Sequence, residues 1–342
     1  MLSLLSLPQY LFQFLGLIVY NQFTDPVVAL EYNPLTAPFI CFRGVTRGDY
    51  RQLVRNNVGK HLKVCSAVGL RNYCIEVVTE KGLGLDRYNH PKVIETIVPV
   101  QYTPANGAIF KARALQYGLE AGHNRLAADD WIVHLDEETV MTEASVAGIV
   151  NFVCDGRHDF GQGVITYAEH RMVNVWTTLM DSGRVADDLG KIRFQFKCLH
   201  KPVFSWKGSY FVCRAEAERR LSFDHGMEGS IAEDCYFALN AYRCGHTFDW
   251  IEGRMCEESP FTVSDFIAQR KRWMQGIHLV VHSSGLPWGC KLWVAMSHYA
   301  WVTSILHKAL IVVLYVKPHY CNYWMSGLSA FVNAVVFYVS VF

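Results

Sequence analysis

The sequence predicts an α/β protein in which a mostly parallel sheet is covered by helices, with apolar segments at both ends of the chain. Two observations lead to this prediction. Strand-like and helix-like segments alternate over residues 36–290, which is the pattern of a parallel sheet. Hydrophobic residues make up 51% of the 342 residues and charged residues only 18%, so the chain has ample material for a large core. The formal net charge of +1 gives no basic field for nucleic acid.

The predicted strands are short, rich in β-branched or aromatic residues and bounded by turn residues. They are residues 38–45, 74–79, 93–100 and 131–136. A first helix is predicted by apolar residues at helical spacing, which are Val54, Val58, Leu62 and Cys65. Thr46 and Asp49 precede this helix in an arrangement like a capping box. A second helix is predicted by Phe110, Ala114 and Tyr117. Ligands of such sheets bind at the carboxyl ends of the strands.

The two ends of the chain are apolar enough to predict contact with a membrane. Residues 1–24 carry no charge and predict a membrane-associated segment, because a signal peptide would need a basic start and a small-residue cleavage site. Residues 292–316 are an apolar run of 25 residues, interrupted by Lys308 and two histidines. Residues 323–342 add 20 residues without a charge. Since about 20 apolar residues span a bilayer, we expect two transmembrane helices, the second of them truncated. Buried core helices are the alternative.

The cysteines predict that the central domain, residues 36–290, faces the cytosol. Eleven cysteines are scattered along the chain without a C-x-x-C pair, which fits neither a zinc framework nor a disulfide scaffold. The sequence also contains no N-x-S/T glycosylation site. Free cysteines without glycan acceptors are typical of a reducing compartment.

Three carboxylates follow the predicted strand over residues 131–136. In an extended segment alternate side chains point to the same face, so Asp136 and Glu138 are expected to lie side by side. Two such charges repel each other unless a cation lies between them, and oxygen ligands suit Mg²⁺ or Mn²⁺. The alternative is a solvated acidic loop that leads into a helix starting near Thr142.

Two later segments carry further candidate residues. Glu233 and Asp234 open a predicted helix over residues 233–244, where a carboxylate acts either as a general base or as a partner of the helix dipole. A second helix is capped by Thr262 and Asp265. On this helix the spacing places Gln269, Arg272 and Trp273 on one side, where arginine suits a phosphate and tryptophan offers a stacking face.

Taken in order, these motifs resemble the inverting, membrane-bound glycosyltransferases of family 2, and more closely the egghead-type β-1,4-mannosyltransferases of animals. The resemblance covers about residues 8–342. The residues that carry it are 47–49, 131–139, 161–163, 204–209, 233–234, 259–262 and 269–273. It implies a GT-A fold and the transfer of mannose from GDP-mannose to glucosylceramide. Two residues depart from the family pattern: Glu80 stands where an aspartate is expected, and Gly44 where a β-branched residue is expected.

The resemblance also implies roles for individual residues. Asp234 is the expected catalytic base, with Glu233 and Trp206 as auxiliary residues, and Asp136 and Glu138 are expected to hold the divalent cation. The expected donor-binding residues are Thr46, Arg47, Glu80, Lys111, Arg113, Asp136 and Arg272. For Lys111 and Arg113 a solvated helix face is an equal alternative.

The expected setting is a multi-pass membrane protein of the Golgi or endoplasmic reticulum. The helix face that carries Gln269, Arg272 and Trp273 is expected to close over the donor and the acceptor. The opposite face is expected to meet the bilayer through Phe266, Ile267, Met274, Arg270 and Lys271. Two other functions stay open: a processive family 2 polysaccharide synthase with the same motifs, and a truncated membrane relative without activity.

Overall fold

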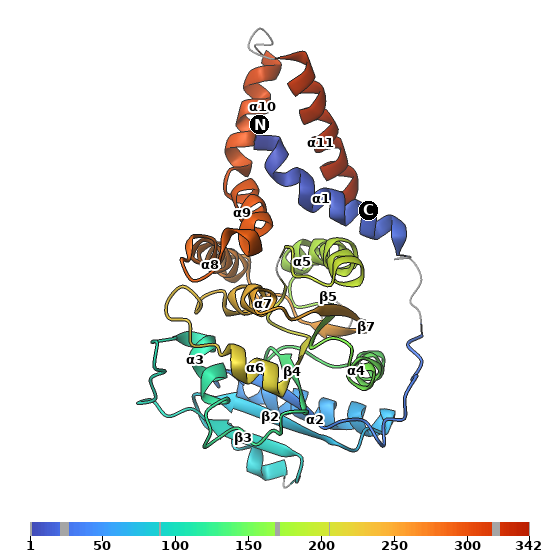
Figure 1. Ribbon diagram of the computed structural model, residues 1–342, viewed down its shortest axis with the longest axis vertical. Helices are drawn as coiled ribbons and strands as arrows, with labels where there is room; N and C mark the ends of the chain where they lie inside the picture. The colour runs from blue at the N-terminus through green and yellow to red at the C-terminus, as the bar shows by residue number, and fades with distance from the viewer. Residues whose placement is uncertain are drawn as a thin grey trace.

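The computed structural model describes residues 2–20, 27–88, 90–167, 172–204, 206–316 and 322–341. They contain a seven-stranded sheet in the order β3-β2-β1-β4-β6-β5-β7 (Figure 1). The strands are β1 (Ile40–Thr46), β2 (Tyr73–Thr79), β3 (Val93–Ile97), β4 (Trp131–Leu135), β5 (Phe160–Tyr167), β6 (Phe211–Arg214) and β7 (Phe248–Glu257). β6 is antiparallel to both of its neighbours, whereas β3, β2, β1 and β4 are mutually parallel. The predicted mixed α/β fold is therefore confirmed.

Helices cover both faces of the sheet because its central strands are apolar on both sides. The covering helices are α2 (Arg51–Val68), α3 (Phe110–Tyr117), α4 (Glu143–Asp155), α6 (Ala215–Leu221) and α7 (Glu233–Arg243). One core contains buried residues of α2 and α4 with Phe42, Ile75 and Val133. The other contains residues of α3, α6 and α7 with Ile132 and Phe211. Alternate residues of β4 thus enter different cores, and the strand ends meet at one edge between the two helical layers.

The helix starts were predicted with mixed success. The Thr262 side chain accepts a hydrogen bond from the Asp265 backbone N–H, so the cap predicted there is confirmed. The helix expected to start near Thr142 is α4, which Thr142 caps in a capping box with Ser145. The cap predicted for α2 is wrong. Thr46 ends β1, and Tyr50 stands at the N-cap of α2 without a side-chain hydrogen bond.

A second group of helices lies above the sheet in Figure 1, with α5 and α8 next to the sheet domain and the others farther up. Its members are α1 (Leu2–Val19), α5 (Val175–Asp187), α8 (Val263–His282), α9 (Trp288–Val302), α10 (Ser304–Val316) and α11 (Tyr323–Val341). A 3₁₀ turn (Leu85–Tyr88) follows β2, and two π-helical turns (Asp188–Ile192 and Gln195–Leu199) follow α5. α1 lies against α9, α11 and the first π-helical turn. Phe12 of α1 packs edge-on against Phe194 and Phe204, with ring centroids 5.3 and 5.0 Å apart.

The apolar ends differ from the predicted spans. The run over 292–316 is not a single helix, because α9 ends at Val302 and α10 begins at Ser304. Within the described residues, we find no helix whose length and apolar content would carry it across a bilayer. Residues 1, 21–24 and 342 of the predicted end segments lie outside the described residues.

Gly44 in β1 faces a small cavity of about 30 Å³. A Cβ atom added at this residue would have no heavy atom within 4 Å, and Phe42, Val54, Val58 and Ile75 are among the lining residues. We expect Gly44→Val to raise the free energy of unfolding by about 1 kcal/mol, because a β-branched side chain favours the strand and fills the space. Urea denaturation measures this change.

Gly163 in β5 provides the matched control for this prediction. A Cβ atom there would overlap the Tyr210 ring, so Gly163→Val is expected to destabilise the protein. If Gly44→Val lowered stability as Gly163→Val does, the cavity would not accept a side chain and the prediction would be wrong.

Candidate active site

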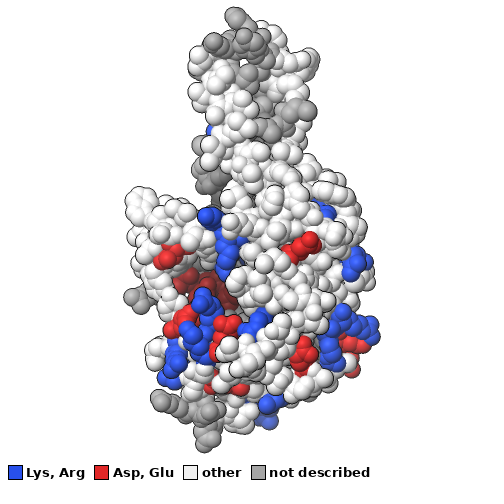
Figure 2. Space-filling view, turned by 90° about the vertical axis from the view of Figure 1, so that its left-hand side faces the viewer, with Lys and Arg blue, Asp and Glu red and all other residues white. Residues whose placement is uncertain are grey.

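The candidate site lies at the edge of the sheet where the parallel strands end. On the face of the molecule shown in Figure 2, acidic side chains lie deep in a hollow and lysine and arginine side chains lie at its rim. Lys111 of α3 contacts several groups of the candidate site. Its ammonium nitrogen pairs with the Asp136 carboxylate, lies 3.6 Å from Glu233 Oε1 and donates to the carbonyl oxygen of Gly208 at 3.1 Å. Lys111 therefore brings together the acidic residues after β4 and those at the start of α7.

Asp136 and Glu138 lie close together, but for a different reason than predicted. The strand ends at Leu135, and residues 136–139 form a turn in which the Thr139 N–H donates to the Asp136 carbonyl oxygen at 3.1 Å. The expected alternation of an extended segment is therefore wrong. Burial, and then the charges of Asp136 and Glu257, raise the pKa of Glu138 well above its ordinary value.

Glu257 is a third carboxylate at this position, and the sequence analysis missed it. It ends β7, a strand that was not predicted. The Thr139 hydroxyl donates to Glu257 Oε1 at 2.5 Å and lies 2.7 Å from the Ser209 hydroxyl. Burial and the charge of Asp136 raise the pKa of Glu257. No local pattern marked this residue, because the segment before it contains Asp249, Glu252 and Arg254.

Asp136, Glu138 and Glu257 are candidate ligands of a hard divalent cation by their chemistry, although within the described residues their oxygens do not all lie within 4.8 Å of one another. Their negative charges are close enough to raise the pKa of Glu138 and of Glu257, and a cation between them would offset this repulsion. Carboxylate oxygens are the ligands that Mg²⁺ and Mn²⁺ prefer. Of these three carboxylates, Asp136 is the one that pairs with Lys111.

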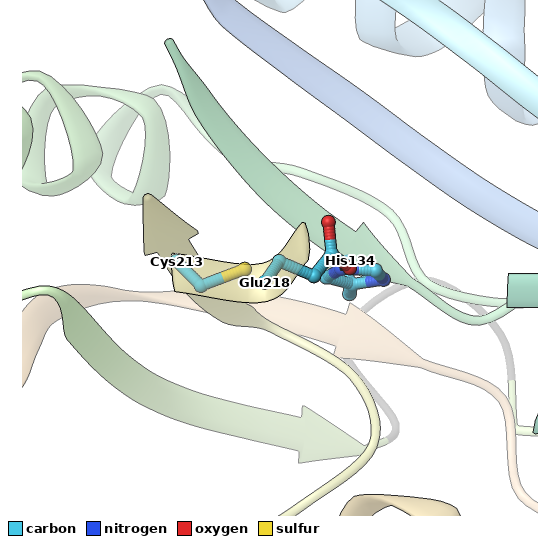
Figure 3. A group of neighbouring side chains, drawn as sticks. All are labelled: His134, Cys213 and Glu218. Atoms are coloured by element: carbon cyan, nitrogen blue, oxygen red, sulfur yellow. The ribbon is translucent and has the colours of Figure 1, made fainter. Parts of the chain in front are cut away.

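A second group of potential ligands does not fit a metal. His134 of β4, Cys213 of β6 and Glu218 of α6 meet in the interior, as Figure 3 shows. Glu218 is already paired through both oxygens, with His134 Nε2 at 2.6 Å and Arg43 Nη1 at 3.3 Å. The positive charge of buried Arg43 opposes a cation, so we assign this group to an ion-pair network that holds α6 against β1 and β4.

Asp234 and its neighbours occupy the first turn of α7. Asp234 Oδ1 accepts the N–H of Cys235 at 2.7 Å, and the Trp206 indole N–H donates to the Asp234 carbonyl oxygen at 2.9 Å. A Cβ atom at Gly208 would lie 3.2 Å from Asp234 Oδ2, so this glycine permits the close approach of its segment to the carboxylate. Burial raises the pKa of Asp234, with a further increase from Asp136. The result is a half-buried carboxylate of raised basicity.

Glu233 has a testable effect on stability. Burial raises its pKa to about 7 from the ordinary value of 4.5, against the opposing effect of the Lys111 charge and with a further increase from Asp234. The folded protein then holds a proton that the unfolded chain releases near pH 4.5, so the free energy of unfolding falls as the pH rises from 4.5 to 7.

We therefore expect Glu233→Gln to stabilise the protein above pH 7, by up to about 3 kcal/mol, since each pKa unit corresponds to about 1.4 kcal/mol. Below pH 4.5 the variant and the wild type should be equally stable, because both side chains are neutral there. Thermal unfolding across this pH range measures the effect. A constant difference at all pH values would contradict the assigned titration.

The predicted donor-binding residues fall into two groups. Thr46 donates to a Glu137 carboxylate oxygen, and Arg47 extends into solvent with 80% of its side chain exposed. Glu80 follows β2 and pairs with Arg113 at 3.1 Å. Arg113 is fixed in turn by the Tyr102 carbonyl oxygen at 2.9 Å. Thr46 ends β1, and Arg47 and Glu80 follow β1 and β2 at the same edge of the sheet as Asp136, whereas Arg113 lies on α3 and Arg272 on α8.

The α8 helix is turned differently than predicted. Arg270 was expected to meet lipid, but it points to the protein, where its guanidinium pairs with buried Asp181 of α5. Trp273 lies under the same guanidinium, and Gln269 is half-buried. Arg272 and Ile267 are exposed. The expected single face of Gln269, Arg272 and Trp273 is thus divided, because only Arg272 points to solvent.

A Rossmann-like sheet, acidic residues at the ends of its strands and a helix that carries Arg272 and Trp273 are together typical of the GT-A class of glycosyltransferases. Residues 131–342 match the model of glycosyl transferase family group 2. The chain is 53% identical over 341 residues to Beta-1,4-mannosyltransferase egh of Drosophila melanogaster, which covers 100% of this chain and 74% of that protein. It is 51% identical over 340 residues to Beta-1,4-mannosyltransferase bre-3 of Caenorhabditis elegans, with 99% and 74% covered. The chain belongs to the egghead-type β-1,4-mannosyltransferases of glycosyltransferase family 2, and it is an enzyme of the hexosyltransferase class.

A solved structure supports the fold across nearly the whole chain. Mannosyltransferase PcManGT from Pyrobaculum calidifontis, in complex with GDP-Man and Mn²⁺, has a TM-score of 0.50 and 13% sequence identity. The similarity covers 98% of each chain. The predicted family and the GT-A fold are therefore confirmed.

Proposed function

We propose that the enzyme transfers mannose from GDP-mannose to the glucose of glucosylceramide, with inversion, in glycosphingolipid synthesis. The observation that carries this proposal is the position of Lys111, which pairs with Asp136 and lies 3.6 Å from Glu233, the residue next to the candidate base Asp234. The GDP-Man named for the Pyrobaculum calidifontis neighbour supports the choice of donor. The carboxylates and basic side chains of the candidate site support the chemistry of the transfer, as described next.

In the proposed reaction Asp234 removes the proton from the acceptor hydroxyl. The hydroxyl oxygen attacks the anomeric carbon of mannose from the face opposite GDP, so one displacement turns an α-linked donor into a β-linked product. The raised pKa of Asp234 makes it a stronger base than an exposed aspartate. Trp206 holds the Asp234 backbone through its indole N–H, and Gly208 leaves space for the Asp234 carboxylate.

The donor is proposed to bind across the ends of β1, β2 and β4. Glu80, held by Arg113, would contact the nucleotide base, and Thr46, Arg47 and Lys111 would contact the diphosphate. Asp136 and Glu138, supported by Glu257, would hold a divalent cation, Mn²⁺ or Mg²⁺, whose charge stabilises the leaving diphosphate. Arg272 is exposed on α8 and would bind the same phosphates from the other side.

We also propose that the enzyme acts at the cytosolic surface of a Golgi or endoplasmic reticulum membrane. The acceptor is a lipid, and α5 exposes large apolar side chains beside α8, namely Val175, Trp176, Leu179 and Met180. In Figure 2 the described surface at the upper end of the molecule, where Figure 1 places α10 and α11, carries almost no charged side chains. Protease added to sealed microsomes should digest the sheet domain, whereas protection until detergent is added would reverse the proposed orientation.

The function is tested by a transfer assay on membranes that contain the expressed protein. Radiolabelled GDP-mannose and UDP-sugars are offered in parallel, with glucosylceramide as the acceptor. A lipid-mobile product from GDP-mannose alone is the expected result. A polymer would indicate a processive synthase, and the absence of any product would indicate an inactive relative.

A further inference from the structure

A buried ion pair joins α5 to the helix that carries Arg272. Asp181 of α5, with only 1% of its side chain exposed, pairs with Arg270 of α8, which is 16% exposed. Arg184 of α5 also pairs with the Asp181 carboxylate, with its Nη1 3.4 Å from Asp181 Oδ1. Two guanidinium groups from different helices therefore share a single buried carboxylate.

The same two guanidinium groups lie over the ring of Trp273. The central carbon of Arg270 is 4.0 Å from the ring centroid and that of Arg184 is 4.5 Å away. Arg184 also donates to the Tyr167 hydroxyl at 2.9 Å, which ties it to the end of β5. Burial and the charge of Arg184 lower the pKa of Arg270 to about 10. Because the cations repel each other, Asp181 is the group that keeps both of them on the ring.

A second contact fixes α8 beside the candidate base. A Cβ atom at Gly276 would lie 2.8 Å from the backbone nitrogen of Ala232, the residue that precedes Glu233 and Asp234. Arg270 and Gly276 are about 9 Å apart along the helix at 1.5 Å per residue. Arg272 lies between these two contacts and is exposed. The direction of Arg272 therefore depends on both contacts being made.

We propose that Asp181 and Arg184 are positioning residues, which hold α8 by Arg270 and Trp273 so that Arg272 faces the donor diphosphate. This inference rests on the proposed function. It assigns Arg270 an internal anchoring role. Neutralising Asp181 would leave two repelling cations on one ring, so the first half of α8 would separate from α5 while the Gly276 contact remains.

The test compares Asp181→Asn with Asp187→Asn in the full chain. Asp187 lies on the same helix and pairs with Lys191 of the following π-helical turn at 3.4 Å, so it is the matched control. Hydrogen exchange over residues 263–275, GDP affinity, and kcat and KM for GDP-mannose are measured for each variant. We expect Asp181→Asn to speed exchange in this segment at least tenfold, to weaken GDP binding severalfold and to lower kcat at least tenfold. Asp187→Asn should change each value less than twofold, and Asp181→Glu should restore most of the kcat.

A second variant keeps the test valid if Asp181→Asn does not fold. Arg270→Met leaves Asp181 paired with Arg184 and removes only the link to α8, so it should show the same changes. Unchanged exchange in either folded variant would overturn the proposal. Faster exchange with unchanged GDP affinity and kcat would overturn it as well, because the link would then be merely structural. If the wild type transfers no mannose while exchange and GDP affinity change as expected, the proposed acceptor is wrong and the positioning role stands.

Discussion

Asp234→Asn is expected to lower the rate of mannose transfer by about 10³-fold while the affinity for GDP stays nearly unchanged. General bases contribute about 10²–10⁴-fold, and the amide has nearly the shape of the carboxylate but cannot take a proton. The oxygen of the substituted side chain would still accept the Cys235 N–H, so α7 should keep its first turn. Single-turnover transfer and GDP binding by calorimetry measure the two quantities separately.

Asp224→Asn is not a suitable comparison, because Asp224 holds the loop before α3 through the N–H groups of Asn106 and Ala108. Asp155 at the end of α4 pairs with Arg157 on the surface, and Asp155→Asn serves as the control with unchanged transfer. A loss of GDP affinity equal to the loss of rate would make Asp234 a donor-binding or structural residue.

Asp136→Asn is expected to reduce donor binding and turnover together, by about 10²-fold or more, because a metal-held diphosphate contributes to both. The substitution also removes the partner of Lys111, which leaves this ammonium group to Glu233 and the Gly208 carbonyl oxygen. Removal of divalent cations from the wild type with EDTA should give a loss of similar size, and Mn²⁺ or Mg²⁺ should restore it.

The variant and the chelator together test the metal site. In Asp136→Asn the added effect of EDTA should be small, because the site has already lost a ligand. Full activity of the wild type in excess EDTA would end the metal hypothesis, and the carboxylates after β4 would then need another role.

Local features of the sequence were sufficient to predict the central strands and the places of several candidate site residues in the fold. Apolar runs such as β2 and β4 are buried on both faces, and this burial leaves few alternatives to a parallel sheet. The position of Asp136 followed from the end of such a run, and the start of α8 followed from the cap formed by Thr262. These features depend on residues within a few positions of each other, so the sequence carries the information directly.

Only the tertiary structure decided how these parts meet. The role of Lys111 depends on α3, β4 and α7 converging, and Glu257 joins the site because β7 returns to the same edge as β4. Arg270 has the spacing of a lipid-facing residue, yet a buried carboxylate on α5, 89 positions away, turns it inward. A helical pattern gives the relative angles of its residues but not the direction of the whole helix, since that direction is fixed by long-range charge pairing and packing.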